Sequence, residues 1–280
     1  MAIPGKYNKL RITKIVDFGV YLDGGEYGEI LLPMKWVPDS STPDDELDVF
    51  LYFDSSDRII ATTQKPLAIR DEFAYLTVKA VNPVGAFLDW GLDKDLLLPY
   101  REQKYKVEEG AKVIVFVYAD DKNRIAASTL IEKYIDTDTS ALERGQEVDL
   151  LIYAATDLGF KAIIDNKYEG VIYANQVFQP IRKGQKIKGY INAIRDDGKV
   201  DISLYKTGYI TKINDLCENV IDVLKQNNGF VPLTEKNTPE EIYLTFSISK
   251  KNFKQALGRL YKSRKIIIEN SGIRLLEKKV

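Results

Sequence analysis

The sequence predicts a multidomain chain, with three all-β five-stranded barrels followed by an α+β domain. Three observations predict this fold class. A pattern of short strand-like segments occurs three times with the same spacing, Gly, Asp and Asn turns separate the segments, and after residue 205 the apolar spacing becomes helical. A chain of 280 residues has room for roughly two to four compact units. We therefore expect domains at 1–66, 67–137, 138–206 and 207–280.

Composition narrows the function before any motif is considered. The chain has no histidine and one cysteine, Cys217, which excludes an internal disulfide, His-ligated zinc, and Ser-His-Asp or Cys-His catalysis. No apolar run reaches the ~18 residues that a membrane span needs, and the N-terminal segment lacks an apolar leader. We expect a non-enzymatic protein with no cofactor, no metal and no membrane partner.

Each repeated segment is centred on a glycine within a strand-like run, at Gly19, Gly85 and Gly159. A leucine lies nine residues before each glycine. Fourteen residues after each glycine, the next run closes with Pro33, Pro99 and Tyr173.

The turn before the last strand starts at Asp54 in the first copy and at Asp120 in the second. In the third copy the turn is assigned to DDGK, which starts at Asp196. We expect the glycines to mark bulges or sharp bends of small closed barrels.

The motifs in these segments identify the type of barrel. A five-stranded barrel of about 70 residues resembles an OB-fold. The runs FGVYLD, VGAFLD and LGFKAI are followed by LLP or VIY and end in DR-I or GKVDISL. They resemble the RNA-binding motif of ribosomal protein S1, and this resemblance covers residues 5–206.

The last domain begins with a helical pattern in NDLCENVIDVLKQNNG, and a short FVPL strand follows. Thr238-Pro239-Glu240-Glu241 is typical of a helix start, with a cap, a proline and acidic residues in the first turn. Ser249 starts a second amphipathic helix, KKNFKQALGRLYKS, and an Asn-Ser-Gly turn then predicts a hairpin. This order is that of a winged helix-turn-helix.

Three S1-type modules followed by a winged helix containing SKKNFKQALGRLYKSRKI resemble the bacterial conserved virulence factor B family over the whole chain. The resemblance implies a cytoplasmic RNA-binding regulator that affects virulence gene expression and has no catalytic activity.

Charge is distributed unevenly along the chain. Residues 1–70 carry 8 basic and 11 acidic side chains, whereas residues 208–280 carry 13 basic and 8 acidic ones. Residues 71–138 are also acidic, with 9 basic and 13 acidic side chains, and residues 139–207 are nearly balanced at 10 and 9. Because phosphate contacts dominate affinity for nucleic acids, we expect the third barrel and the winged helix to bind single-stranded RNA.

Matching the S1 motif residue by residue gives the candidate binding positions in the barrels. Stacking positions on the strands hold aromatic rings in an incomplete set, and basic residues precede the last strands. The barrel candidates are Phe18, Tyr21, Arg58, Phe87, Arg124, Phe160, Lys161, Tyr173, Lys186, Lys188 and Lys199. For each aromatic ring, a role in the barrel core is the alternative.

The winged helix supplies a second set of basic candidates on one helix and at the hairpin: Lys250, Lys251, Lys254, Lys262, Arg264 and Lys265. A solvated helix face is the alternative for these lysines. Two other functions remain open. One is a transcription factor that reads duplex DNA through Asn252, Gln255 and Arg259, and the other is a scaffold on the ribosome or RNA polymerase.

Overall fold

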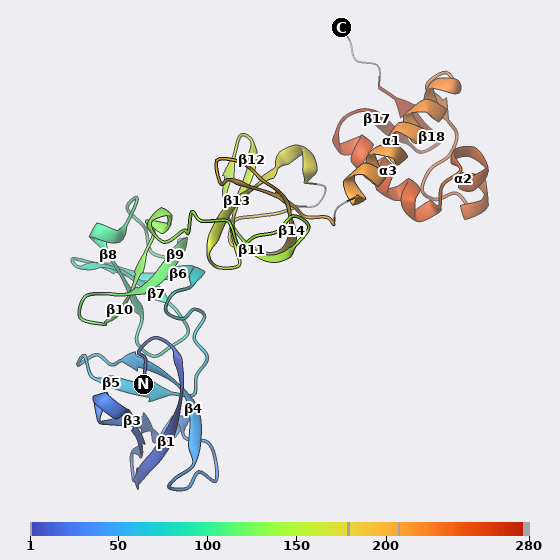
Figure 1. The fold of residues 1–280 in the computed structure, drawn as a ribbon. Coiled ribbons are helices and arrows are strands. Elements are labelled where there is room, and N and C mark those ends of the chain that lie inside the picture. The colour runs from blue at the N-terminus through green and yellow to red at the C-terminus, as the bar shows by residue number, and fades with distance from the viewer. Residues whose placement is uncertain (1, 178–179, 207, 277–280) are drawn as a thin grey trace.

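The computed structural model describes residues 2–177, 180–206 and 208–276. Three closed five-stranded barrels are followed by a helical domain with a small three-stranded sheet, so the predicted fold class is confirmed. The first two barrels lie end to end, the third continues to one side, and the helical domain forms the far end of the chain (Figure 1).

The fifteen barrel strands form three sets with one topology. In barrel 1 they are β1 Tyr7–Val16, β2 Gly19–Asp23, β3 Glu29–Pro33, β4 Glu46–Phe53 and β5 Ile59–Thr62. In barrel 2 they are β6 Phe73–Asn82, β7 Gly85–Asp89, β8 Leu96–Pro99, β9 Lys112–Ala119 and β10 Ile125–Ser128. In barrel 3 they are β11 Glu147–Thr156, β12 Gly159–Ile164, β13 Tyr168–Tyr173, β14 Lys186–Ile194 and β15 Val200–Ser203. In each barrel the third and fifth strands pair in parallel, and all other neighbours are antiparallel.

The repeated glycines occupy the same place in all three barrels. Each begins the second strand and pairs across the sheet with the residue fourteen positions later: Gly19 with Pro33, Gly85 with Pro99, and Gly159 with Tyr173. A Cβ on these glycines would lie 2.2, 2.4 and 2.1 Å from a carbonyl oxygen of the third strand. Close approach of two backbones therefore requires glycine here.

The expected bulge lies elsewhere. A register shift occurs in the first strand of each barrel, between Ile12 and Lys14 in barrel 1 and between Ile152 and Ala154 in barrel 3, and β14 of barrel 3 has another between Ile191 and Ala193. Barrel 2 has the first-strand shift between Val78 and Ala80. The long first strand must bend to pair with both the second and the fourth strands, so the extra residue is placed there rather than at the glycine.

Barrels 1 and 2 share an apolar contact centred on Trp90. Its indole is 3% exposed and meets the rings of Phe50 and Tyr52 of barrel 1 edge-on, with centroids 5.7 and 6.5 Å apart. The Trp90 ring nitrogen donates to the Lys94 carbonyl oxygen at 2.6 Å. The Lys94 ammonium in turn donates to the Asp54 carbonyl oxygen of barrel 1 at 2.6 Å. The two barrels are joined by buried aromatic surface as well as by their linker.

A second apolar cluster joins barrels 2 and 3. It combines Phe73 and Ile114 of barrel 2 with Leu151, Tyr153 and Ile163 of barrel 3, all of them buried. Tyr134, from the segment between the barrels, stacks on Phe116 with centroids 4.1 Å apart. Burial of several large side chains at each junction favours a fixed arrangement of the barrels.

The C-terminal domain has the predicted element order. It comprises α1 Tyr209–Gln226, β16 Phe230–Val231, α2 Pro239–Phe246, α3 Lys250–Lys262, β17 Ile266–Glu269 and β18 Gly272–Leu275. Thr238 and Glu241 form a reciprocal capping box at the start of α2, and the Ser249 hydroxyl accepts from the Asn252 amide at the start of α3. Phe246 and Phe253 pack together in the core between the helices.

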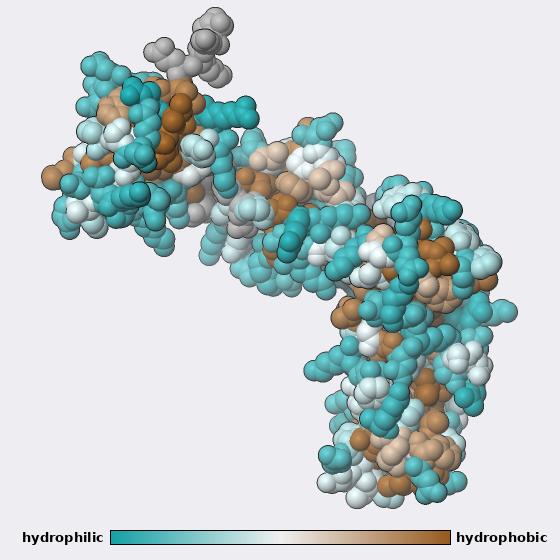
Figure 2. Space-filling model, turned by 180° about the vertical axis from the view of Figure 1, so that it is seen from behind, coloured by the Kyte–Doolittle hydropathy of each residue, from teal (hydrophilic) through white to brown (hydrophobic). Residues whose placement is uncertain are grey.

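The face of the chain seen from behind is mostly hydrophilic (Figure 2). In the view from behind, charged and polar residues cover much of the barrels, and a distinct apolar band marks the C-terminal domain (Figure 2). Within the described ranges, no helix combines the length and apolar character needed to cross a membrane.

Candidate nucleic-acid interface

In barrel 1, the two predicted aromatic residues lie side by side at the start of β2. The Phe18 ring is 59% exposed and meets the half-buried Tyr21 ring edge-on at 6.3 Å. Arg58, which precedes β5, is held by Asp54 through contacts of 2.7 and 2.9 Å. Barrel 1 therefore offers one exposed and one half-buried aromatic ring, and the charge of Arg58 is compensated by Asp54.

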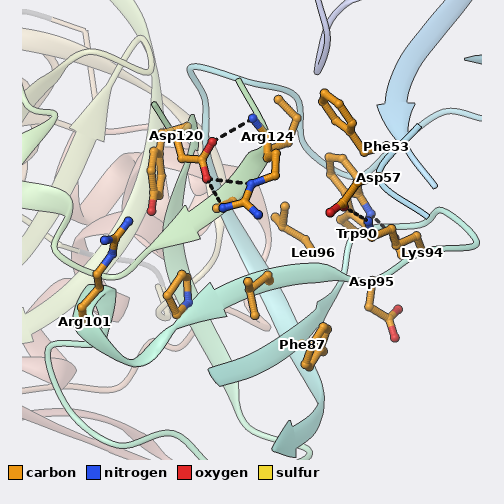
Figure 3. A pocket seen from close by; sticks show the side chains of 15 residues that line it. Phe53, Asp57, Phe87, Trp90, Lys94, Asp95, Leu96, Arg101, Asp120 and Arg124 are labelled. Atoms are coloured by element: carbon orange, nitrogen blue, oxygen red, sulfur yellow. Dashed lines mark hydrogen bonds and ion pairs between the residues drawn. The ribbon is translucent and has the colours of Figure 1, made fainter. Parts of the chain in front are cut away.

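In barrel 2, the predicted residues Phe87 and Arg124 line one pocket of about 370 Å³, together with Arg101 and Tyr118 (Figure 3). Phe53 and Asp57 of barrel 1 also line this pocket, so barrel 1 forms one of its sides (Figure 3). The Tyr118 hydroxyl is buried in this pocket, and its burial raises the pKa of Tyr118.

The Arg124 side chain in this pocket is fixed by Asp120. Its Nε and Nη2 donate to Asp120 Oδ2 at 3.0 and 2.7 Å, and the Arg124 amide donates to Oδ1. Burial alone would raise the pKa of Asp120, but these hydrogen bonds outweigh it and hold the pKa below its ordinary value. The guanidinium is thus positioned, but its charge is largely compensated.

Barrel 3 gathers three of the predicted residues, Lys161, Tyr173 and Lys199, around a pocket of about 530 Å³ on β12, β13 and β15. Each lysine has an acidic neighbour: Lys161 lies 2.5 Å from Glu169, and Lys199 lies 2.6 Å from Asp197. The pocket is bordered by the inter-barrel segment 135–139. Tyr173 is the aromatic surface of this pocket.

Arg195 also belongs to this pocket, and the sequence assignment missed it. Its guanidinium lies over the Tyr173 ring, 5.9 Å from the centroid, contacts the Tyr173 hydroxyl, and pairs with Asp201 at 2.8 Å. The sequence assignment started the turn of the third copy at Asp196. In the structure the Arg195 amide donates to the Lys199 carbonyl oxygen, as the Asp54 amide donates to the Arg58 carbonyl oxygen in barrel 1. The turn of the third copy therefore starts at Arg195. Counting back from the last strand, rather than forward from the glycine, would have found it.

Other barrel candidates lie away from this face. Lys186 and Lys188 are on β14, where Lys186 lines a pocket at the junction with barrel 2 and Lys188 pairs with Asp149 at 2.7 Å. The half-buried Phe160 side chain packs against the barrel 3 core. The structure therefore brings neither these lysines nor Phe160 together with Tyr173.

In the winged helix, the predicted cations occupy different surroundings. Lys250 donates to the Asn237 carbonyl oxygen at 2.7 Å, and Lys254 lies 3.6 Å from Glu235. Lys251 is exposed on α3, and Arg264 is exposed just after it with φ +53°. The residues weighed for reading DNA bases, Asn252, Gln255 and Arg259, are half-buried.

Lys262 and Lys265 lie where the winged helix meets barrel 3. They line a pocket of about 420 Å³ to which Ala174 and Asn175 of barrel 3 and Glu218 of α1 also contribute. Ala174 and Asn175 directly follow Tyr173 in the chain. The candidate faces of barrel 3 and of the winged helix are therefore adjacent. Among the residues that the structure describes, no cluster of three or more acidic or cysteine side chains could hold a metal ion.

The modules match known domain families. The S1 domain family matches residues 4–64 and 72–130, and the CvfB-like winged helix domain family matches residues 218–275. Barrel 3 has the same strand order as the two matched barrels.

The chain is also similar to bacterial proteins over most of its length. It is 30% identical to an uncharacterized protein, YitL, of Bacillus subtilis, over 95% of this chain and 92% of that one. It is 25% identical to conserved virulence factor B of Staphylococcus aureus, over 92% and 89% of the two chains. A solved multidomain protein with nucleic acid binding domains from Streptococcus pneumoniae is 23% identical, with a TM-score of 0.43 and 98% of each chain covered. This chain belongs to the conserved virulence factor B family of bacterial proteins, which combines S1 domains with a winged helix.

Proposed function

We propose that this protein is a non-enzymatic regulator of gene expression, including virulence genes, that binds single-stranded RNA in the bacterial cytoplasm. Barrel 3 and the winged helix form the main binding surface. Membership in a family that combines S1 and winged-helix domains supports a nucleic-acid-binding role. The absence of histidine from the sequence favours binding rather than catalysis.

The adjacency of Tyr173 and α3 carries the proposal. Single-stranded RNA is held by stacking of unpaired bases on aromatic rings and by cations that follow the phosphates. Tyr173 supplies a ring, and the two residues after it line the same pocket as Lys262 and Lys265. One strand can therefore pass from the Tyr173 ring directly to the cations at the end of α3.

The two surfaces contribute different kinds of interaction. On barrel 3, Lys161, Arg195 and Lys199 are each paired with a carboxylate, so this barrel offers mainly stacking and orientation. The sequence of α3, KKNFKQALGRLYK, contains no acidic residue, although Lys254 lies 3.6 Å from Glu235 outside the helix. Phosphate contact, and with it most of the salt dependence, is assigned to α3.

Reading of duplex DNA is less well supported. Base-edge recognition in the major groove uses bidentate Arg, Asn or Gln side chains. On α3 the Asn252, Gln255 and Arg259 side chains are half-buried, and the exposed side chains are mainly those of lysines. Lysine is suited to sequence-independent contact with a phosphate backbone.

A competition experiment with the full chain tests this proposal. Single-stranded RNA, single-stranded DNA of the same sequence, and the corresponding duplex DNA compete for the protein at two salt concentrations. We expect single-stranded RNA to bind most tightly, with affinity that falls as salt rises. Tighter binding of the duplex would support a transcription factor instead, and no measurable binding of any nucleic acid would support a protein scaffold.

A further inference from the structure

Gly258 lies within α3 at a position where nothing in the chain requires a glycine. It is exposed, and a Cβ built there meets no atom within 4 Å. Its φ is not positive, so its backbone is open to any residue. Among the described glycines without a positive φ, the others are crowded, with neighbours 2.3–2.6 Å from a built Cβ: Gly24, Gly170, Gly189 and Gly272.

A glycine in this setting weakens the helix that contains it. Glycine is the least favourable residue in a helix interior apart from proline, because it loses the most backbone freedom on folding. Close approach of a ligand to the main chain is one physical reason for a glycine where packing and backbone conformation do not need it.

The surroundings of Gly258 indicate the chemistry of that ligand. At helical spacing, Lys251, Lys254, Tyr261 and Lys262 share its face of α3, and all four are exposed. The Tyr261 side chain is 57% exposed, which leaves its ring accessible to a base. A smooth strip between lysines, with an aromatic ring beside it, is complementary to a sugar–phosphate backbone that carries unpaired bases.

The strip also continues the surface assigned to RNA. Lys262, one turn after Gly258, lines the pocket shared with Ala174 and Asn175 of barrel 3. A strand that leaves the Tyr173 ring by this route reaches the C-terminal end of α3 first and Gly258 next.

We propose that single-stranded RNA bound to barrel 3 continues along α3, with its sugar–phosphate backbone in direct contact with the main chain at Gly258. The inference rests on the proposed function and assigns a specific path to it. Lys251, Lys254 and Lys262 lie beside the phosphates, and Tyr261 stacks on a base. Any side chain at position 258 would hold the strand away from the helix and weaken all of these contacts together.

Substitutions at Gly258 in the full chain test this path, because stability and binding should change in opposite directions. Gly258→Ala is expected to raise the melting midpoint of the helical circular dichroism signal by about 4 °C, since every α-helix that the structure describes belongs to this domain. Its affinity for single-stranded RNA should fall about threefold, and that of Gly258→Gln about tenfold. The dependence of log affinity on log salt should become shallower in Gly258→Gln, because the lysines of α3 then neutralise fewer phosphates and release fewer counterions.

Gln226→Ala, at the exposed end of α1, is the matched control and should bind RNA like the unmodified chain. If the unmodified chain does not bind single-stranded RNA, the proposed function itself is wrong. If it binds and both Gly258 variants bind equally well, the path across α3 is wrong while the proposed function stands. A lower melting midpoint for Gly258→Ala would indicate a structural role for the glycine and would also overturn the path.

Discussion

Asn166, in the turn between β12 and β13 of barrel 3, holds the first strand of barrel 2 through the amide of Phe73. The Phe73 amide donates to Asn166 Oδ1 at 2.6 Å, and Asn166 Nδ2 donates to the Asp71 carbonyl oxygen at 3.0 Å. The side-chain amide of barrel 3 thus provides hydrogen-bond partners for a backbone N–H and a backbone carbonyl at the start of β6 in barrel 2. With the apolar cluster around Tyr153, this contact fixes barrel 3 relative to barrel 2.

Removing this amide should loosen the junction between barrels 2 and 3. Asn166 has φ +58°, so Asn166→Gly keeps the backbone conformation and removes only the side chain. We expect the free energy of unfolding to fall by about 1–3 kcal/mol, because the Phe73 amide loses its partner. Small-angle scattering should show a wider range of shapes. Asn228→Gly, also at positive φ but in the winged helix, should leave the shape unchanged. Unchanged scattering for Asn166→Gly would mean that the apolar cluster alone sets the junction.

Substitution of a repeated glycine should unfold its barrel through a backbone clash. In Gly159→Ala the new Cβ would lie 2.1 Å from the Ile172 carbonyl oxygen, which the β12–β13 pairing holds in place. We expect a loss of about 3 kcal/mol or more in denaturant titration, since the backbone cannot yield. Gly110→Ala, at φ +79° with open space around it, should cost only about 1 kcal/mol of backbone strain. Equal losses in the two variants would contradict the clash.

The sequence predicted those features that depend on local chain geometry. The fourteen-residue interval from Gly159 to Tyr173 is a cross-strand register, and such a register repeats wherever the hairpin repeats. Helix caps such as Thr238 were equally predictable, because a cap acts on its own first turn. Arg195 was missed because the third copy places its turn one residue later relative to the glycine.

Interactions that depend on distant parts of the chain could not be predicted. The pairing of Lys161 with Glu169 and of Arg195 with Asp201 is set by side-chain direction on neighbouring strands. These pairs reduce the net charge that barrel 3 presents, so a count of its lysines overstates the barrel's electrostatic contribution. The contact of Trp90 with Phe50 has no local signature in either repeat.

The ion pair in the barrel 2 pocket should make stability depend on pH. The pKa of Asp120 is lowered in the folded chain, so its contribution is present above the unfolded pKa of about 4 and is lost as pH falls through the folded value. Asp120→Asn should therefore reduce the free energy of unfolding by about 1–3 kcal/mol at neutral pH, and the difference from the unmodified chain should shrink below about pH 4.

Asp121→Asn is the control for this pH dependence, because Asp121 is the exposed neighbour in the same turn. It makes the same charge change and should have little effect at any pH. The measurement is urea unfolding across a pH series. A constant difference between Asp120→Asn and the unmodified chain down to pH values well below 4 would show that the carboxylate charge is not what stabilises the turn.

Opposite changes in RNA affinity are expected from the two members of the Lys161–Glu169 pair. Glu169→Gln frees the lysine from a carboxylate 2.5 Å away, so it should strengthen RNA binding and steepen the dependence of log affinity on log salt by about one unit. Lys161→Gln should weaken binding and reduce the slope by about one unit. Filter binding across a salt series measures both. If both variants match the unmodified chain, the barrel 3 pocket does not contact phosphate.

Tyr173 should contribute to RNA binding by stacking and not by charge. Tyr173→Ala is expected to weaken binding by about 1–3 kcal/mol while the salt slope stays the same, because no cation is removed. Tyr173→Phe keeps the ring and loses only the hydroxyl contact with Arg195, so it should bind nearly as well as the unmodified chain. Circular dichroism and denaturant unfolding establish that both variants are folded. If Tyr173→Phe binds as weakly as Tyr173→Ala, the hydroxyl that positions Arg195 is responsible, and the base is not stacked on this ring. If Tyr173→Ala binds normally, the path from barrel 3 to the winged helix does not pass over Tyr173.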